Sequence, residues 1–135
     1  MADLSAAAEA EIRARHDFFV AWFTGRASKD EMQRAAQAFA PDMQRIGPEG
    51  EAQDADAVIA MIRAAEGRID GVFEIDIEVE TVRRLSDNLI LVVYIERQSI
   101  DSRTTARRST ALFSPDPDAP EGVVWRHLQE TWIAQ

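Results

Sequence analysis

The spacing of apolar residues along the first part of the chain is helical. Over Leu4–Phe23 they recur at steps that place them on one face of a helix. Ser28 and Glu31 form a capping box, in which each side chain can satisfy a free amide at the start of a second helix. The buried stripe of that helix runs to Phe39, and Pro41 prevents its continuation. The pattern therefore predicts two consecutive helices.

A third helix is predicted after a turn-rich segment. Met43–Ile46 is apolar enough for a brief strand, and residues 47–50 form a Gly- and Pro-rich turn behind it. Asp54 or Asp56 can cap the helix that follows, and Gly67 suits the left-handed position after its end.

After Gly71 the apolar period changes from helical to two. Apolar and acidic residues alternate over Phe73–Glu80, which is typical of a strand with one buried face and one wet face. Leu89–Ile95 is continuously apolar, as in a central strand covered on both sides. Thr104–Phe113 and Val123–Ile133 are two further strands. The predicted class is α+β, with three N-terminal helices packed on a strongly curved antiparallel sheet.

The acidic residues of the first long strand require cations nearby. Four carboxylates share its wet face, and like charges on one face repel each other. We expect arginines of the neighbouring strand or of a second subunit to pair with them. These carboxylates belong to Glu74, Asp76, Glu78 and Glu80.

Length and charge limit the possible functions. A chain of 135 residues suits one domain, so we expect residues 1–135 to form a single unit. The net charge of −9 argues against nucleic acid and anionic membranes as partners. The chain has no cysteine, no signal-peptide pattern at its start and no apolar run near the roughly 18 residues of a membrane span. We expect a cytoplasmic protein that is not bound to a membrane.

Four motifs resemble the nuclear transport factor 2-like superfamily, and in particular its SnoaL-like and uncharacterised members. They are FAPD at 39–42, IGPEG at 46–50, TARRSTALF at 105–113 and WRHLQETW at 125–132. The resemblance extends from Ile12 to Ile133. It implies a cone-shaped, cystatin-like fold with a pocket between the concave sheet face and the first helix. It also implies a homodimer through the outer sheet face, and we expect no cofactor.

Several polar residues of the predicted strands can share one face. A hairpin at residues 101–103 would place Glu96 opposite Ser109, and Arg107 can come near Glu130 across the last loop. Such a face could bind a carboxylate or carbonyl group and exchange a proton, or it could be a charge-paired ladder near the open end of the sheet. A slip of one residue would send half of it to the other side. Its members are Tyr94, Glu96, Arg107, Ser109 and Glu130.

The histidines and aromatic residues allow both structural and functional interpretations. His127 would share a face with Trp125, either as a pocket base or as a half-buried, hydrogen-bonded histidine. His16 points toward the sheet, at the cavity mouth or in the core. Two histidines without cysteine leave no convincing set of metal ligands. The aromatic residues that could line a cavity or simply fill the core are Phe18, Phe19, Trp22, Phe23 and Trp132.

Three functional hypotheses follow from these residues. The leading one is a homodimeric cone that binds a small apolar molecule or a carbonyl or carboxylate compound, with no assigned reaction. The alternative is a SnoaL-like lyase or isomerase that moves a proton next to a carbonyl, with His127 or Glu96 as base and Arg107 as electrostatic stabiliser. The third is an association module whose filled cone only dimerises. The residues of ketosteroid isomerases and scytalone-type dehydratases have no full counterpart here, since Tyr94 is the single tyrosine.

Overall fold

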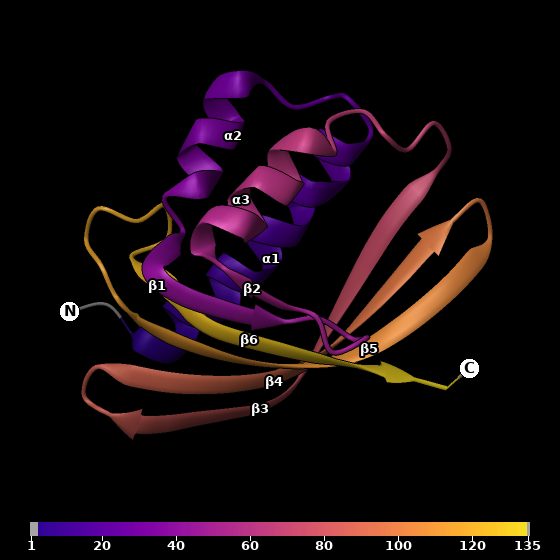
Figure 1. Cartoon of the computed structure of the whole chain (residues 1–135). Helices are drawn as coiled ribbons and strands as arrows, with labels where there is room; N and C mark the ends of the chain where they lie inside the picture. Colours follow the sequence, from indigo (N-terminus) through magenta and orange to yellow (C-terminus); the bar gives the residue numbers. More distant parts are fainter. Residues whose placement is uncertain (1–2, 135) are drawn as a thin grey trace.

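Three helices pack on one side of a strongly bent, six-stranded sheet (Figure 1). A computed structural model describes residues 3–134, so the predicted domain limits at Met1 and Gln135 lie outside the described residues. The elements are α1 (Leu4–Phe23), α2 (Lys29–Ala36), β1 (Phe39–Ile46), β2 (Ala52–Asp54), α3 (Ala55–Ala64), β3 (Phe73–Ser86), β4 (Leu89–Ile100), β5 (Arg103–Pro115) and β6 (Val123–Ile133).

The sheet has the strand order β2-β1-β6-β5-β4-β3. The four long strands β3 to β6 form an antiparallel meander, as the sequence predicts. The sheet as a whole is mixed, because β1 runs parallel to β6. The short β2 pairs with β1 and was not predicted, since three residues are too few to reveal a period. The α+β class with a curved sheet is confirmed.

The helix caps follow the sequence closely. The Ser28 hydroxyl accepts from the Glu31 amide at 3.1 Å, and Asp54 rather than Asp56 caps α3 by accepting from the Ala57 amide at 2.8 Å. Helix α2 ends earlier than predicted, because Phe39 already belongs to β1 and pairs with β6. The residue directly before a proline favours extended backbone, so Ala40 belongs to β1 and not to the helix.

The β4–β5 hairpin has a register that differs by two residues from the prediction. Asp101 and Ser102 form a two-residue turn with positive φ angles, so Glu96 lies opposite Arg107 and not opposite Ser109. The partner of Ser109 is Tyr94. Side chains alternate with a period of two, so a shift of two residues leaves every side chain on its predicted face.

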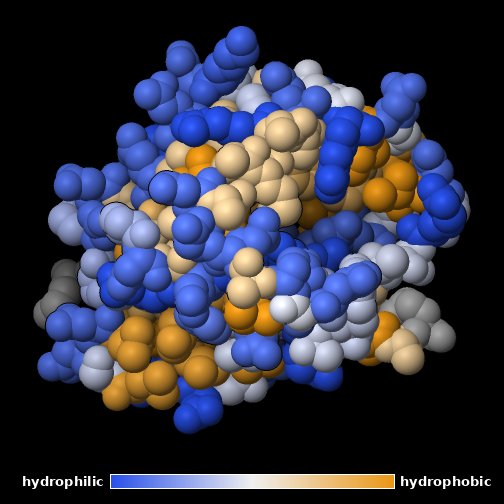
Figure 2. All heavy atoms as spheres, viewed as in Figure 1, coloured by the Kyte–Doolittle hydropathy of each residue, from blue (hydrophilic) through white to orange (hydrophobic). Residues whose placement is uncertain are grey.

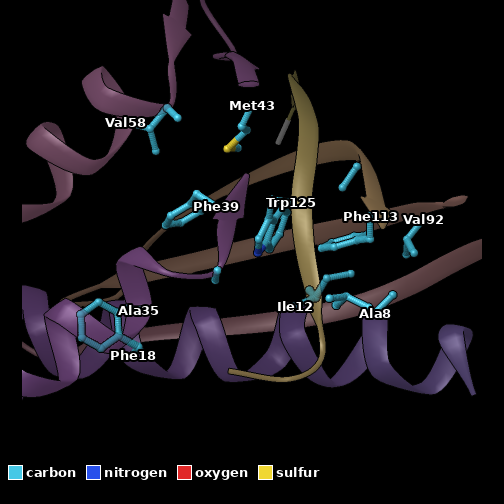
Figure 3. Close-up of a cluster of buried hydrophobic side chains, with 14 of the residues drawn as sticks. Ala8, Ile12, Phe18, Ala35, Phe39, Met43, Val58, Val92, Phe113 and Trp125 are labelled. Atoms are coloured by element: carbon cyan, nitrogen blue, oxygen red, sulfur yellow. The ribbon is translucent and has the colours of Figure 1, made fainter. Parts of the chain in front are cut away.

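Trp125 of β6 lies at the centre of the core (Figure 3). Its ring centroid is 4.6 Å from that of Phe113 and 6.5 Å from that of Phe39. The indole Nε1–H donates to Glu11 of α1 at 2.8 Å, and the neighbouring Ile12 is fully buried. The last strand is thus packed directly against the first helix.

Figure 2 shows a face with many hydrophilic side chains, apolar areas over the helices and a strongly hydrophobic patch over the β3–β4 hairpin. Val82 and Leu85 of β3 are 39% and 45% exposed there. None of the helices within residues 3–134 is both long and apolar enough to cross a membrane.

Candidate functional site

A cavity of about 450 Å³ opens between the helices and the concave face of the sheet. One part of its wall is apolar and comes from α1, β1 and β6. The other part is charged. The apolar side chains include Phe19, Phe23, Phe39, Met43, Trp125 and Leu128.

The charged part of the wall is a row of alternating sign, which we call the charge row. Each of five elements contributes one side chain to it, namely α1, β4, β5, β6 and β1 in that spatial order. The row exists because β4, β5 and β6 are neighbours in register and α1 lies across β4. Its members are His16, Glu96, Arg107, Glu130 and Arg45.

His16 and Glu96 form a buried ion pair at one end of the charge row. His16 Nε2 lies 3.0 Å from Glu96 Oε1, and His16 Nδ1 lies 2.7 Å from the carbonyl oxygen of Ile12. Both neighbours are acceptors, so the site favours the form of His16 in which both ring nitrogens carry a proton. Burial alone would lower the pKa of His16, but the Glu96 carboxylate outweighs it and the pKa is raised.

The same contacts keep Glu96 ionised. Burial alone would raise its pKa, but His16, with help from Arg107 and Gln98, lowers the pKa to about 2. Glu96 Oε2 also accepts a hydrogen bond from the side-chain amide of Gln98. Both carboxylate oxygens are therefore engaged by donors.

Glu130 lies between two arginines at the other end of the charge row. Its Oε1 accepts from Arg45 Nε at 2.8 Å and lies 2.7 Å from Arg45 Nη2, and its Oε2 accepts from Arg107 Nη1 at 3.2 Å. The guanidinium carbon of Arg107 also lies 4.7 Å from the ring centroid of Trp132. Arg45 is tied further to Gln53 at 2.6 Å. These contacts fix the two guanidinium groups in place.

Tyr94 and Ser109 belong to the predicted polar face but lie beneath the cavity wall. Both are fully buried, and neither hydroxyl has a hydrogen-bond partner in the described part of the chain. Burial, with the nearby charges of Glu96 and Glu130, raises the pKa of Tyr94 well above its ordinary value. Neither residue lines the cavity, so a ligand in it would not touch them.

Seven of the residues predicted for the site or for a cavity wall line the cavity, namely His16, Phe19, Phe23, Glu96, Arg107, Glu130 and Trp132. Trp22 does not, because it points toward α2 and α3, where its indole N–H donates to the Ile62 carbonyl at 2.7 Å. The helical spacing predicts Trp22 next to the apolar face of α1. In the structure it packs against α3 instead, so its role is structural.

His127 lies on the convex face of the sheet, so the prediction that it lines the pocket is wrong. Phe113 pairs with Trp125, and Leu112 pairs with His127, which leaves Arg126 as an extra residue on β6. Such a bulge reverses the alternation of faces beyond it. His127 therefore lies beside Arg108 and Thr110, on the face opposite to Trp125.

Arg45 was missed at the sequence level. Met43 and Arg45 are two residues apart on β1, so both face the cavity. The alternation was present in the sequence, but the strand is short and its parallel pairing with β6 could not be inferred. No group of three His, Asp or Glu side chains within residues 3–134 is arranged to hold a metal ion.

The fold matches several solved structures. An NTF-2-like protein of unknown function from Pseudomonas aeruginosa has a TM-score of 0.85 and 27% identity, with 95% of this chain and 99% of that chain covered. The CaMKII hub from S. rosetta has a TM-score of 0.73 and 14% identity over 98% and 99% of the two chains. A ketosteroid isomerase-like protein from Erwinia carotovora atroseptica has a TM-score of 0.69 and 12% identity over 100% of both. No family model and no curated protein matches the sequence.

Proposed function

Since this chain is a nuclear transport factor 2-like protein by fold, we propose that it is a single domain that binds a small, partly apolar molecule in its cone. The observation that carries the proposal is the cavity of about 450 Å³, apolar on one side and charged on the other. Ligand pockets typically measure roughly 300–1,000 Å³ and combine apolar walls with a few fixed polar groups. A cone that served only for association would not need buried charges around a hollow.

Binding is better supported than proton transfer. A general base must be free to accept a proton, whereas both oxygens of Glu96 are engaged and its pKa is about 2. Both ring nitrogens of His16 are engaged as well. His127, the other proposed base, faces away from the cavity. A SnoaL-like reaction would require the ligand to break the His16–Glu96 pair first.

We also propose that the convex face of the sheet forms a homodimer. Leu91 and Leu112 lie directly opposite one another on this face, next to Val93, and all three are only half-buried in the single chain. A central apolar row flanked by charged residues is typical of protein interfaces. One structural neighbour is named as a kinase hub, and a second, from Exiguobacterium sibiricum, as a putative association domain.

The cavity proposal can be tested with a matched pair of variants. Leu128→Trp places a large ring into the cavity wall, whereas Leu85→Trp makes the same exchange at an exposed site on β3. Each protein is screened by thermal shift against a library of small acids, ketones and amides. We expect ligands that raise the Tm of the wild type and of Leu85→Trp but not of Leu128→Trp. Equal responses of both variants, or no response of the wild type, would refute binding in the cone.

The dimer is tested by sedimentation equilibrium. We expect a dimer for the wild type and a monomer for Leu112→Glu, because a carboxylate would be buried in the interface. A monomeric wild type would rule the dimer out. A dimeric Leu112→Glu would place the interface elsewhere.

A further inference from the structure

We propose that the ligand of this cavity is an organic acid bound as its anion, with the carboxylate held by Arg107 and the apolar part against the aromatic wall. This inference rests on the proposed binding function and specifies the ligand class. It follows from the hydrogen-bonding capacity that the charge row leaves unused.

The acceptors of the charge row are already saturated. Glu130 receives hydrogen bonds from two guanidinium groups, and each of its oxygens has at least one donor. Glu96 receives one from His16 and one from Gln98, again one on each oxygen. A ligand that offers mainly N–H or O–H donors would have to displace charged partners, which is costly at a buried site.

The donors of the charge row are not saturated. Arg107 donates from Nη1 to Glu130, but its Nε–H is buried and has no partner among residues 3–134. A guanidinium has five N–H donors in a planar fork that matches a carboxylate. Trp132 covers one face of this group, so the edge of the guanidinium is what remains for recognition. A small shift of Arg107 toward a carboxylate would give its free donors an acceptor.

The charge balance also favours an anion. Arg107 and Arg45 face Glu96 and Glu130 in equal number, so the charge row has an excess of one positive charge whenever His16 is protonated. Charges of both signs lie at the rim as well, from Arg68, Glu49 and Glu51. Glu51 lies 3.9 Å from Arg45, but its side chain is 48% exposed, and water screens such charges far more than buried ones. A single carboxylate would neutralise the excess inside the cavity.

The apolar wall defines the rest of the ligand. Phe19 and Phe23 stack on each other with ring centroids 5.6 Å apart, and Leu128 lies on the strand across the cavity. An aromatic or branched aliphatic body would bury its surface there. Phenylacetate and 4-phenylbutyrate combine a carboxylate with an aromatic ring. Their amides differ from them only in charge and in hydrogen-bond donors.

Titration calorimetry with the two acids and their two amides tests the inference. We expect each acid to bind the wild type at least tenfold more tightly than its amide. Arg107→Gln should remove this preference, and Arg107→Lys should keep part of it, because lysine retains the charge but not the fork. Arg97→Gln is the matched control, since Arg97 pairs with Glu78 on the convex face. The Arg97→Gln variant should prefer acids over amides as strongly as the wild type does.

The outcomes separate this inference from the binding proposal. Amides that bind as tightly as acids would refute the anion preference and leave the cavity as a binding site. Neutral library ligands that bind while all four probes fail would do the same. A library screen that finds no ligand for the wild type would refute the binding proposal as well. The acid–amide comparison in the wild type decides the matter even if the Arg107 variants do not fold.

Discussion

The two faces of the sheet carry the same kind of ion pair in opposite environments. On the concave face, Glu130 lies between Arg45 and Arg107, and its side chain is only 4% exposed. On the convex face, Glu78 pairs with Arg97, and its side chain is 53% exposed. The chemical groups are the same, but only the concave pair has lost its water.

This difference decides what each pair does. Exposed ion pairs add little to stability, because water and salt screen them and ordering two long side chains costs entropy. Buried pairs are expensive to desolvate, and breaking one leaves an unpaired charge in the interior. The convex pairs reduce the repulsion within the acidic row of β3: Arg97 of the neighbouring strand β4 pairs with Glu78 as predicted, and Arg108 of β5, one strand further away, pairs with Glu80. The concave pairs hold polar groups inside a cavity, where a ligand can use them.

The largest effect is expected for Glu130→Gln. The variant leaves Arg45 and Arg107 side by side without their shared carboxylate, so we expect a loss of about 3–5 kcal/mol in the free energy of unfolding. Urea denaturation followed by circular dichroism measures it. A loss below about 1 kcal/mol would mean that water or another group compensates both arginines, and the contrast between the faces would disappear.

A somewhat smaller effect is expected for Glu96→Gln, and it should depend on pH. The pKa of Glu96 is lowered from its ordinary 4.5 to about 2, which corresponds to about 3 kcal/mol of stabilisation in the ionised state. A group with a lowered pKa contributes fully above 4.5 and loses its contribution as the pH falls through its folded value. The wild type should thus exceed the variant by about 3 kcal/mol at pH 7, and the gap should close toward pH 2. A gap that stays constant would contradict the ion pair.

The titration of His16 gives a direct view of the same pair. Its raised pKa means that its stabilising contribution is complete below the ordinary value of 6.5 and is lost as the pH rises through the folded pKa. Proton–carbon NMR of the imidazole should show a midpoint above 6.5 in the wild type. In Glu96→Gln, no carboxylate offsets the effect of burial on the pKa of His16, so the midpoint should move below 6.5. The same midpoint in both proteins would show that Glu96 does not control His16.

The smallest effect is expected for Glu80→Gln on the convex face. Glu80 pairs with Arg108 at 2.8 Å, in surroundings that water reaches. The urea midpoint should hardly move from that of the wild type, and added salt should remove any difference. A loss as large as that of Glu130→Gln would mean that the convex pair is buried in solution, as it would be inside a dimer interface. The measurement is therefore repeated over a series of protein concentrations, so that any contribution of a dimer interface is seen.

The period of apolar residues was enough to predict most of the fold and the faces of most strands. The change of period after Gly71 predicted the four-stranded meander, and Tyr94, Glu96 and Arg107 share the concave side as expected. The register between β4 and β5 was predicted two residues away from its real position. The predicted face was still correct, because the face of a side chain depends only on whether its residue number is odd or even along the strand.

The failures lie where this alternation is interrupted or cannot be traced. The bulge at Arg126 reverses the faces on β6, so His127 leaves the cavity while Trp125 stays. A bulge depends on how two strands fit, and β6 alone gives no sign of it. Arg45 was missed for a related reason, since β1 joins the sheet through a parallel pairing with a strand about 80 residues later.

The sequence by itself determined the classes of element, the caps of the helices and the set of polar residues that an apolar face must accommodate, because these depend on neighbours along the chain. Only the tertiary structure decided that His16 meets Glu96 and that Arg45 joins Glu130. Those contacts join residues 80 and 85 positions apart. Their strength depends on how far water is excluded, which is a property of the folded cone and not of any local segment.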